Sequence, residues 1–198
     1  MTRAELKQVA KEQISGKIWL IFAMTLIVAI MGFACGLIPF IGAIGAIIVS
    51  SAFVISFCTI YLKLANYEEI SVNNIFDGFK ITGKAIWLNI MISVFTFLWS
   101  LLFVIPGIIK AYSYSMAYFI LAEHPEYTAQ ESLEKSKEIM NGHKMDLFVL
   151  QLSFILWDIL VGITFGIAAI YVIPYKSATI ANFYNSIKDE GEKINIEG

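Results

Sequence analysis

The chain alternates between long apolar blocks and polar segments, and this alternation restricts its fold more than any other feature. Blocks that are long enough, or nearly long enough, to cross a bilayer occupy residues 18–38, 41–62, 85–105, 107–122, 145–162 and 166–187. A crossing needs about 20 apolar residues. The composition agrees, because 58% of the residues are apolar and only 15% are charged, whereas soluble domains have about 45–50% and about 25%. We therefore predict an all-α, polytopic membrane helix bundle with six spans.

The connections between the blocks are of two kinds, and they alternate along the chain. Three are short, uncharged and rich in Gly or Pro, at residues 36–42, 104–109 and 162–167. The polar segments hold twelve of the fourteen Lys and Arg residues, and they are residues 1–17, 63–84, 123–144 and 188–198. Positively charged loops stay on the cytoplasmic side of a membrane. The pattern predicts three helical hairpins, with both termini and all four polar segments cytoplasmic.

Three polar segments carry the pattern of amphipathic helices. Residues 2–15 and 128–141 each begin with a Thr followed three residues later by a Glu, which is the spacing of a capping box. Residues 71–79 place Val72, Ile75, Phe76 and Phe79 in an apolar stripe. We expect three helices that lie at the cytoplasmic interface or pack under the bundle.

The same unit recurs three times along the chain. Each of these helices is followed by a glycine close to a lysine, in "SGK" (15–17), "TGK" (82–84) and "NGHK" (141–144). The step from the lysine to the outer turn is 22 residues for Lys17 to Pro39 and for Lys84 to Pro106. The spacing predicts one membrane domain over residues 1–198, with a threefold internal repeat of 1–64, 65–122 and 123–188.

Three charged side chains fall inside the apolar blocks. They are Lys110, Asp158 and Lys176. Counted along straight helices from the cytoplasmic ends of their spans, they reach similar depths. A charge at the centre of a span costs at least about 2.5–3.5 kcal/mol, so such residues normally pair, face a cavity or extend to the interface.

Two interpretations of these charges remain open. In the first, Lys110 and Asp158 form an ion pair that joins two spans, and Lys176 extends to the interface. In the second, they line a polar cavity that binds an anionic guest such as a lipid phosphate, with Pro174 marking a helix break beside it. The candidate ligand-binding residues are then Lys110, Tyr114, Asp158, Tyr171, Tyr175 and Lys176.

No pattern of an enzyme is visible in the sequence. His124 and His143 have no metal-ligand spacing and no nucleophile beside them. Cys35 and Cys58 fall in apolar blocks and are expected to be buried thiols. There is no phosphate-binding glycine loop and no polybasic patch. We predict no catalytic residues, no metal, no cofactor and no nucleic-acid partner.

Several stretches resemble one protein family. They are "AELKQVAKEQISGK" near the start, residues 105–148 and 152–175, and "FY" at 183–184. They are similar to the Domain of Unknown Function 975 family, small integral membrane proteins found chiefly in Gram-positive bacteria. The resemblance implies a multi-span protein of the bacterial cytoplasmic membrane, and it brings no catalytic residues with it.

Two functions fit these observations. The first is a non-enzymatic membrane protein that binds or helps to move an anionic lipid or amphiphile. The alternative is a structural or regulatory subunit whose cytoplasmic helices engage another membrane or cytoplasmic protein. The position of the three intramembrane charges distinguishes the two.

Overall fold

The described part of the chain is helical from end to end in the computed structural model. The structure describes residues 1–37, 41–102 and 104–197, and it describes side chains outside 36, 38–44, 102–104 and 189–198. The helices are α1 (Arg3–Ile14), α2 (Ile18–Gly36), α3 (Ile41–Ala65), the 3-10 helix η1 (Val72–Ile81), α4 (Thr82–Leu102), α5 (Val104–Tyr114), α6 (Ala117–Glu123), α7 (Ala129–Ile139), α8 (Lys144–Leu152), α9 (Ile155–Ile163) and α10 (Ala169–Glu197).

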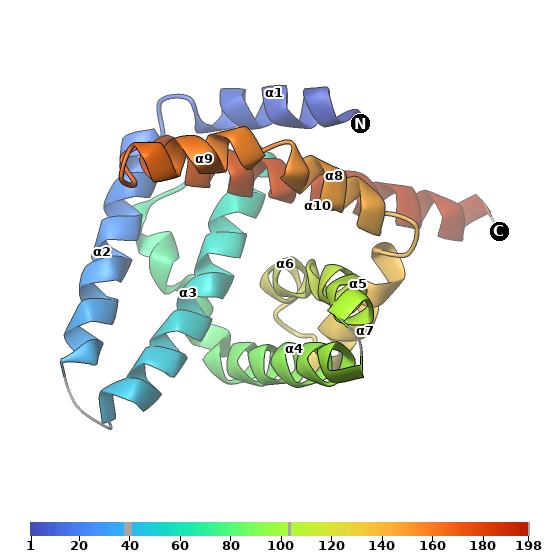
Figure 1. Cartoon of the computed structure of the whole chain (residues 1–198), viewed down its shortest axis with the longest axis horizontal. Coiled ribbons are helices and arrows are strands. Elements are labelled where there is room, and N and C mark those ends of the chain that lie inside the picture. Colours follow the sequence, from blue (N-terminus) through green and yellow to red (C-terminus); the bar gives the residue numbers. More distant parts are fainter. Residues whose placement is uncertain (38–40, 103, 198) are drawn as a thin grey trace.

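Successive helices pack in pairs, but the pairs point in different directions. α2 packs against α3, α4 against α5, and α9 against α10. In Figure 1, α2 and α3 run down the picture, whereas α4, α8, α9 and α10 run across it and α6 is seen nearly end-on. The described helices therefore do not form a bundle with a common axis.

Four of the described stretches are long and apolar enough to cross a membrane. They are Ile18–Cys35, Gly45–Ala65, Val72–Leu101 and Lys144–Ile163. The expected six spans are not confirmed. The block 107–122 divides into α5 and α6, and the last block becomes the long α10, which continues through Pro174 without the helix break that the sequence led us to expect.

The short connections are only partly where the sequence placed them. Gly166 has a positive φ of 90° in the turn between α9 and α10, as expected. Most of the connection at 36–42 lies outside the described residues. Pro106-Gly107 was the expected turn after α4, but both residues lie in the first turns of α5. Proline is tolerated there because the first amides of a helix have no partner within it.

Helix caps in the polar segments agree with the sequence pattern. Both capping boxes form, Thr2 with Glu5 and Thr128 with Glu131. Gly16 and Gly142 have positive φ values of 77° and 89° after α1 and α7, a conformation that glycine adopts without strain. The third glycine of the pattern, Gly83, lies inside α4 instead. The threefold repeat itself remains a prediction.

The 3-10 helix η1 differs from the amphipathic helix expected at 71–79. Of the expected apolar stripe only Ile75 is buried, and the other three members are exposed. η1 contacts α3 through the Phe79 ring, whose centroid lies 5.3 Å from that of Phe53. It also contacts α3 through Gly78, whose amide donates to the Ser56 hydroxyl at 2.9 Å. A Cβ at Gly78 would lie 1.9 Å from the Ala52 carbonyl oxygen, so only glycine allows this approach.

Two apolar blocks are interrupted, and a neighbouring helix supplies a polar side chain at each interruption. Between α5 and α6, the Ser136 hydroxyl of α7 donates to the Ser113 carbonyl at 2.8 Å and accepts from the Met116 amide at 3.2 Å. Between α8 and α9, the Lys7 ammonium of α1 donates to the Ser153 carbonyl at 3.1 Å. Backbone groups away from water need such partners.

Much of the described surface is apolar. None of the residues of α9 is buried, and α4 exposes Trp87, Phe97 and Leu101 at 58%, 66% and 73%. Soluble monomers rarely expose continuous apolar patches of this extent. Together with the four apolar stretches, this surface indicates a membrane protein.

We expect Ser136→Ala to destabilise the fold, because it leaves the buried Met116 amide without its acceptor. The cost of an unsatisfied buried group is about 1–3 kcal/mol, which corresponds to a fall in melting temperature of a few degrees for a chain of this size. Thermal unfolding in detergent measures it.

Ser132→Ala is the matched control for this substitution. Ser132 is equally buried one turn earlier in α7, but its hydroxyl bonds only to the Thr128 carbonyl of its own helix. Equal effects of the two substitutions would contradict the role given to Ser136.

Candidate ligand-binding site

Four of the six predicted site residues gather where α9 packs against α10. The Asp158 carboxylate forms an ion pair with the Lys176 ammonium, with N···O distances of 2.9 and 3.2 Å. On the same helix as Lys176, the ring centroids of Tyr171 and Tyr175 lie 5.7 Å apart. Side-chain exposures of 50% for Asp158 and 31% for Lys176 place the ion pair at the surface.

The expected pair of Lys110 with Asp158 is not the one that forms. Among the ion pairs of the described residues, Asp158 pairs with Lys176, and the Lys110 ammonium lies over the Trp99 ring, 4.8 Å from its centroid. Figure 1 shows α5, which carries Lys110, well separated from α9. The depth estimate assumed one straight helix from Lys144, whereas the chain breaks between α8 and α9, and α5 packs against α8.

Tyr114 also lies apart from the other candidates. Its side chain is 3% exposed and belongs to the core formed by α4, α6 and α7. It lines a groove of about 490 Å³ between α4 and α5–α6, together with Tyr118 and the hydroxyls of Ser93, Thr96, Ser100 and Ser115. The cavity expected around Lys110, Tyr114 and Asp158 is therefore divided between two regions of the molecule.

α1 adds two lysines that the sequence analysis did not single out. The Lys7 ammonium lies 4.3 Å from the centroid of the Phe154 ring, and the Lys11 ammonium lies 5.5 Å from that of Tyr175. Lys7 and Lys11 are four residues apart and so project from one side of α1. That spacing is visible in the sequence, but nothing in the sequence says which helix this side meets.

Aromatic rings connect these lysines to the ion pair. Phe154 and Tyr175 are in edge-to-face contact, with centroids 5.1 Å apart. Trp157 contacts both Tyr171 and Tyr175 at 6.0 Å. We call the set Lys7, Lys11, Phe154, Trp157, Asp158, Tyr171, Tyr175 and Lys176 the lysine–aromatic cluster.

The lysine–aromatic cluster has more positive than negative charge. Among the described ion pairs, none joins Lys7 or Lys11 to a carboxylate. Burial, and then the nearby ammonium of Lys11, lower the pKa of Lys7 from its ordinary value. Both effects disfavour the charged form, and an anion beside the two lysines would oppose them.

A buried amide pair holds α1 in this position. The Gln13 amide donates to the Asn182 side-chain carbonyl at 3.2 Å and to the Ala65 backbone carbonyl at 3.1 Å. Asn182 donates back to Gln13 at 2.6 Å. Both side chains are 5% exposed, so the pair joins α1 to α10 and α3 away from solvent.

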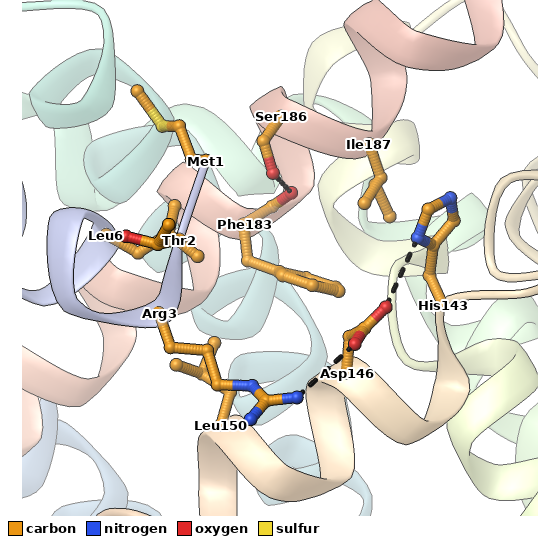
Figure 2. A pocket seen from close by; sticks show the side chains of 10 residues that line it. All are labelled: Met1, Thr2, Arg3, Leu6, His143, Asp146, Leu150, Phe183, Ser186 and Ile187. Atoms are coloured by element: carbon orange, nitrogen blue, oxygen red, sulfur yellow. Dashed lines mark hydrogen bonds and ion pairs between the residues drawn. The ribbon is translucent and has the colours of Figure 1, made fainter.

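A separate pocket of about 440 Å³ lies between the start of α1, the start of α8 and α10. Figure 2 shows Arg3 and His143 pointing toward Asp146 from either side. The distances are 3.5 Å from Arg3 and 3.6 Å from His143 to the Asp146 carboxylate. Arg3 and His143 therefore share one carboxylate, whereas Lys7 and Lys11 of the lysine–aromatic cluster have none among the described ion pairs.

Glu123 joins α6 to α10. It forms an ion pair with Lys188 at 2.7 Å and accepts a hydrogen bond from the Tyr184 hydroxyl. Burial by itself would raise the pKa of Glu123, but the hydrogen bonds from Lys188 and Tyr184 outweigh it and hold the pKa below its ordinary value.

Other isolated polar residues have plain structural roles. Gln151 makes an interhelical bond, accepting from the Tyr112 hydroxyl at 2.9 Å. Asn89 instead accepts from the Ser93 hydroxyl of its own helix, α4, at 3.4 Å. Over the part of the chain that the structure describes, no three His, Cys, Asp or Glu residues come together as metal ligands.

We expect Gln13→Ala to loosen α1, because it leaves the Asn182 amide and the Ala65 carbonyl buried without their partner. The loss is about 1–3 kcal/mol, measured as the free energy of unfolding in detergent. Gln8→Ala is the control, because Gln8 is exposed on another side of α1 and bonds only Glu12. If Gln8→Ala costs as much as Gln13→Ala, the amide pair is not what holds α1.

We expect the stabilisation from Glu123 to depend on pH. A carboxyl group whose pKa is lowered by folding stabilises the fold above its ordinary pKa of about 4.5, and this contribution disappears as the pH falls through the lowered value. The free energy of unfolding of the wild type should be about 1 kcal/mol higher than that of Glu123→Gln at pH 7. This difference, measured by unfolding in detergent at several pH values, should shrink below about pH 4.5. A difference that grows on acidification would contradict this assignment; Glu134→Gln, an exposed residue of α7, is the control.

Comparison with known proteins gives one clear result. The profile of the family described as "Protein of unknown function (DUF975)" matches residues 1–112 and 101–191. No curated protein and no solved structure matches the chain. The family profile covers almost the whole chain and confirms the resemblance drawn from residues 105–148, so this protein belongs to the DUF975 family.

Proposed function

We propose that this chain is a multi-pass protein of the bacterial cytoplasmic membrane that binds an anionic lipid or amphiphile at the lysine–aromatic cluster, without catalysing a reaction. The observation that carries the proposal is that the lysine–aromatic cluster holds three lysines and one carboxylate: Lys7 and Lys11 lie over aromatic rings, and only Lys176 pairs with Asp158. The site differs from the one predicted from sequence: it keeps Asp158, Tyr171, Tyr175 and Lys176, and takes its further cations from α1.

The proposed topology is multi-pass, with the four long apolar stretches as its crossings. Both termini then lie in the cytoplasm. The distribution of lysines and arginines supports this arrangement, because twelve of fourteen fall in the four polar segments.

The neighbourhood of the cluster fits an amphiphile better than a free anion. α9 carries Asp158 and has none of its residues buried, and its Leu156 and Ile163 are 75% and 70% exposed. An alkyl chain along this apolar surface would bring its head group to the lysines. Basic sites beside membrane helices are typical binding places for anionic lipid head groups.

The alternative, a regulatory subunit that engages a partner through its cytoplasmic helices, has less support. α1 and α7 already contact their own chain through Lys7, Gln13 and Ser136. A partner would have to bind their outer faces, which are charged and exposed.

We expect a Lys7→Gln/Lys11→Gln double variant to lose co-purifying anionic phospholipid. Each lysine near an anionic head group contributes about 1 kcal/mol, so the affinity should fall roughly 10- to 30-fold. Native mass spectrometry of protein purified in mild detergent measures the bound lipid. Glutamine keeps a donor for the Ser153 carbonyl, so the α8–α9 break retains its partner.

The control is the double variant Lys80→Gln/Lys135→Gln. It removes the same charge from lysines that pair with Asp77 and Glu138 of their own helices. Lys110→Gln is a third arm, because Lys110 belonged to the site expected from sequence. Equal lipid loss in the control variant would contradict the proposed site. Lipid loss in Lys110→Gln alone would indicate that the lipid binds at α5, near Lys110.

A further inference from the structure

We infer that the head group bound at the lysine–aromatic cluster is a doubly charged phosphate group of a membrane lipid, either one phosphomonoester or two phosphodiesters. This inference rests on the proposed function and specifies its ligand. It follows from the number of unpaired cations, from their spacing across two aromatic rings, and from the apolar surface that adjoins them.

The charge of the cluster leaves two positive charges uncompensated. Lys176 and Asp158 neutralise each other at 2.9 Å. Lys7 and Lys11 remain, and the described ion pairs give neither of them a carboxylate. A ligand with one negative charge would leave one of the two lysines without an anion, whereas a ligand with two would match both.

The acidic residues of α1 itself do not fill this role. Glu5 closes the capping box with Thr2 at the start of the helix. Glu12 accepts from Gln8, and the positions 8 and 12 are turned about 100° around the helix from 7 and 11. The side of α1 that carries Lys7 and Lys11 therefore has no acidic residue of α1 that could neutralise them.

The ammonium groups of Lys7 and Lys11 lie on neighbouring rings of one aromatic contact. Lys7 lies over Phe154 and Lys11 over Tyr175, and these rings touch edge to face with centroids 5.1 Å apart. The two buried rings place both cations next to one another. A phosphomonoester can bridge the two cations, and a pair of linked phosphodiesters can place one phosphate at each.

The lipid source is favoured over a soluble phosphate by the surroundings of the cluster. Trp157 of α9 is partly buried and contacts Tyr171 and Tyr175 of α10, and the rest of α9 exposes apolar side chains along its length. A soluble phosphate would use only the lysines, whereas a lipid would also cover this apolar surface.

Competitive lipid binding tests the inference on the full-length protein. Native mass spectrometry compares phosphatidic acid and cardiolipin, which carry two charges, with phosphatidylglycerol, which carries one, at equal concentrations with matched acyl chains. A further arm adds inorganic phosphate or pyrophosphate to the lipid-bound protein. We expect both doubly charged lipids to bind about five- to ten-fold more tightly than phosphatidylglycerol, from about 1 kcal/mol for the additional charge.

Lys11→Gln is the diagnostic variant. None of the side-chain hydrogen bonds of the described residues involves the Lys11 ammonium, so its substitution removes one charge and its contact with the Tyr175 ring but no hydrogen bond. We expect it to abolish the preference for doubly charged lipids while phosphatidylglycerol still binds. Lys135→Gln, which removes the same charge from a lysine paired with Glu138, should keep the preference.

The outcomes separate failure of the inference from failure of the proposed function. If Lys7→Gln/Lys11→Gln retains every lipid as well as wild type does, the proposed function fails. If lipids require these lysines but phosphatidylglycerol binds as tightly as the doubly charged lipids, the proposed function stands and this inference is overturned. Displacement of the lipid by an equal concentration of inorganic phosphate or pyrophosphate would overturn the lipid source.

Discussion

The structure depends on hydrogen bonds that side chains of α1 and α7 make at helix breaks in apolar segments. Backbone groups in lipid or in a protein core have no water to bond, so a break is tolerated only where protein supplies the partner. Ser136 supplies it between α5 and α6, and Lys7 supplies it between α8 and α9. These contacts make the polar-segment helices part of the core and explain why neither block forms one straight span.

The contact of Lys7 with the α8–α9 break also creates the candidate site. A lysine that bonds the Ser153 carbonyl must lie beside Phe154, and its neighbour Lys11 then reaches Tyr175. Gln13, two residues further on, fixes this placement through Asn182. Stability and ligand binding therefore share one helix, and a head group that binds Lys7 and Lys11 would also stabilise the attachment of α1 to α10.

Local features were predictable because they depend on neighbouring residues. The capping boxes at Thr2 and Thr128, the glycine turns at Gly16 and Gly142, and the apolar blocks follow from spacing and composition. The pairing of Asp158 was not predictable, because its depth was counted along a helix that in fact breaks at Ser153. η1 was predicted only in part: Ile75 and Phe79 of the expected apolar stripe pack on α3, but the close approach at Gly78 was not foreseen.

The sequence by itself determined that the chain is helical, apolar enough for a membrane, and charged in four separated segments, because these properties depend on composition and on periods of a few residues. Only the tertiary structure decided which cation meets Asp158, where the helices break, and that α1 brings Lys7 and Lys11 to the rings of Phe154 and Tyr175. Apolar helices pack with similar energy in many registers. Their arrangement is therefore set by a few long-range polar contacts, and residue spacing does not reveal these.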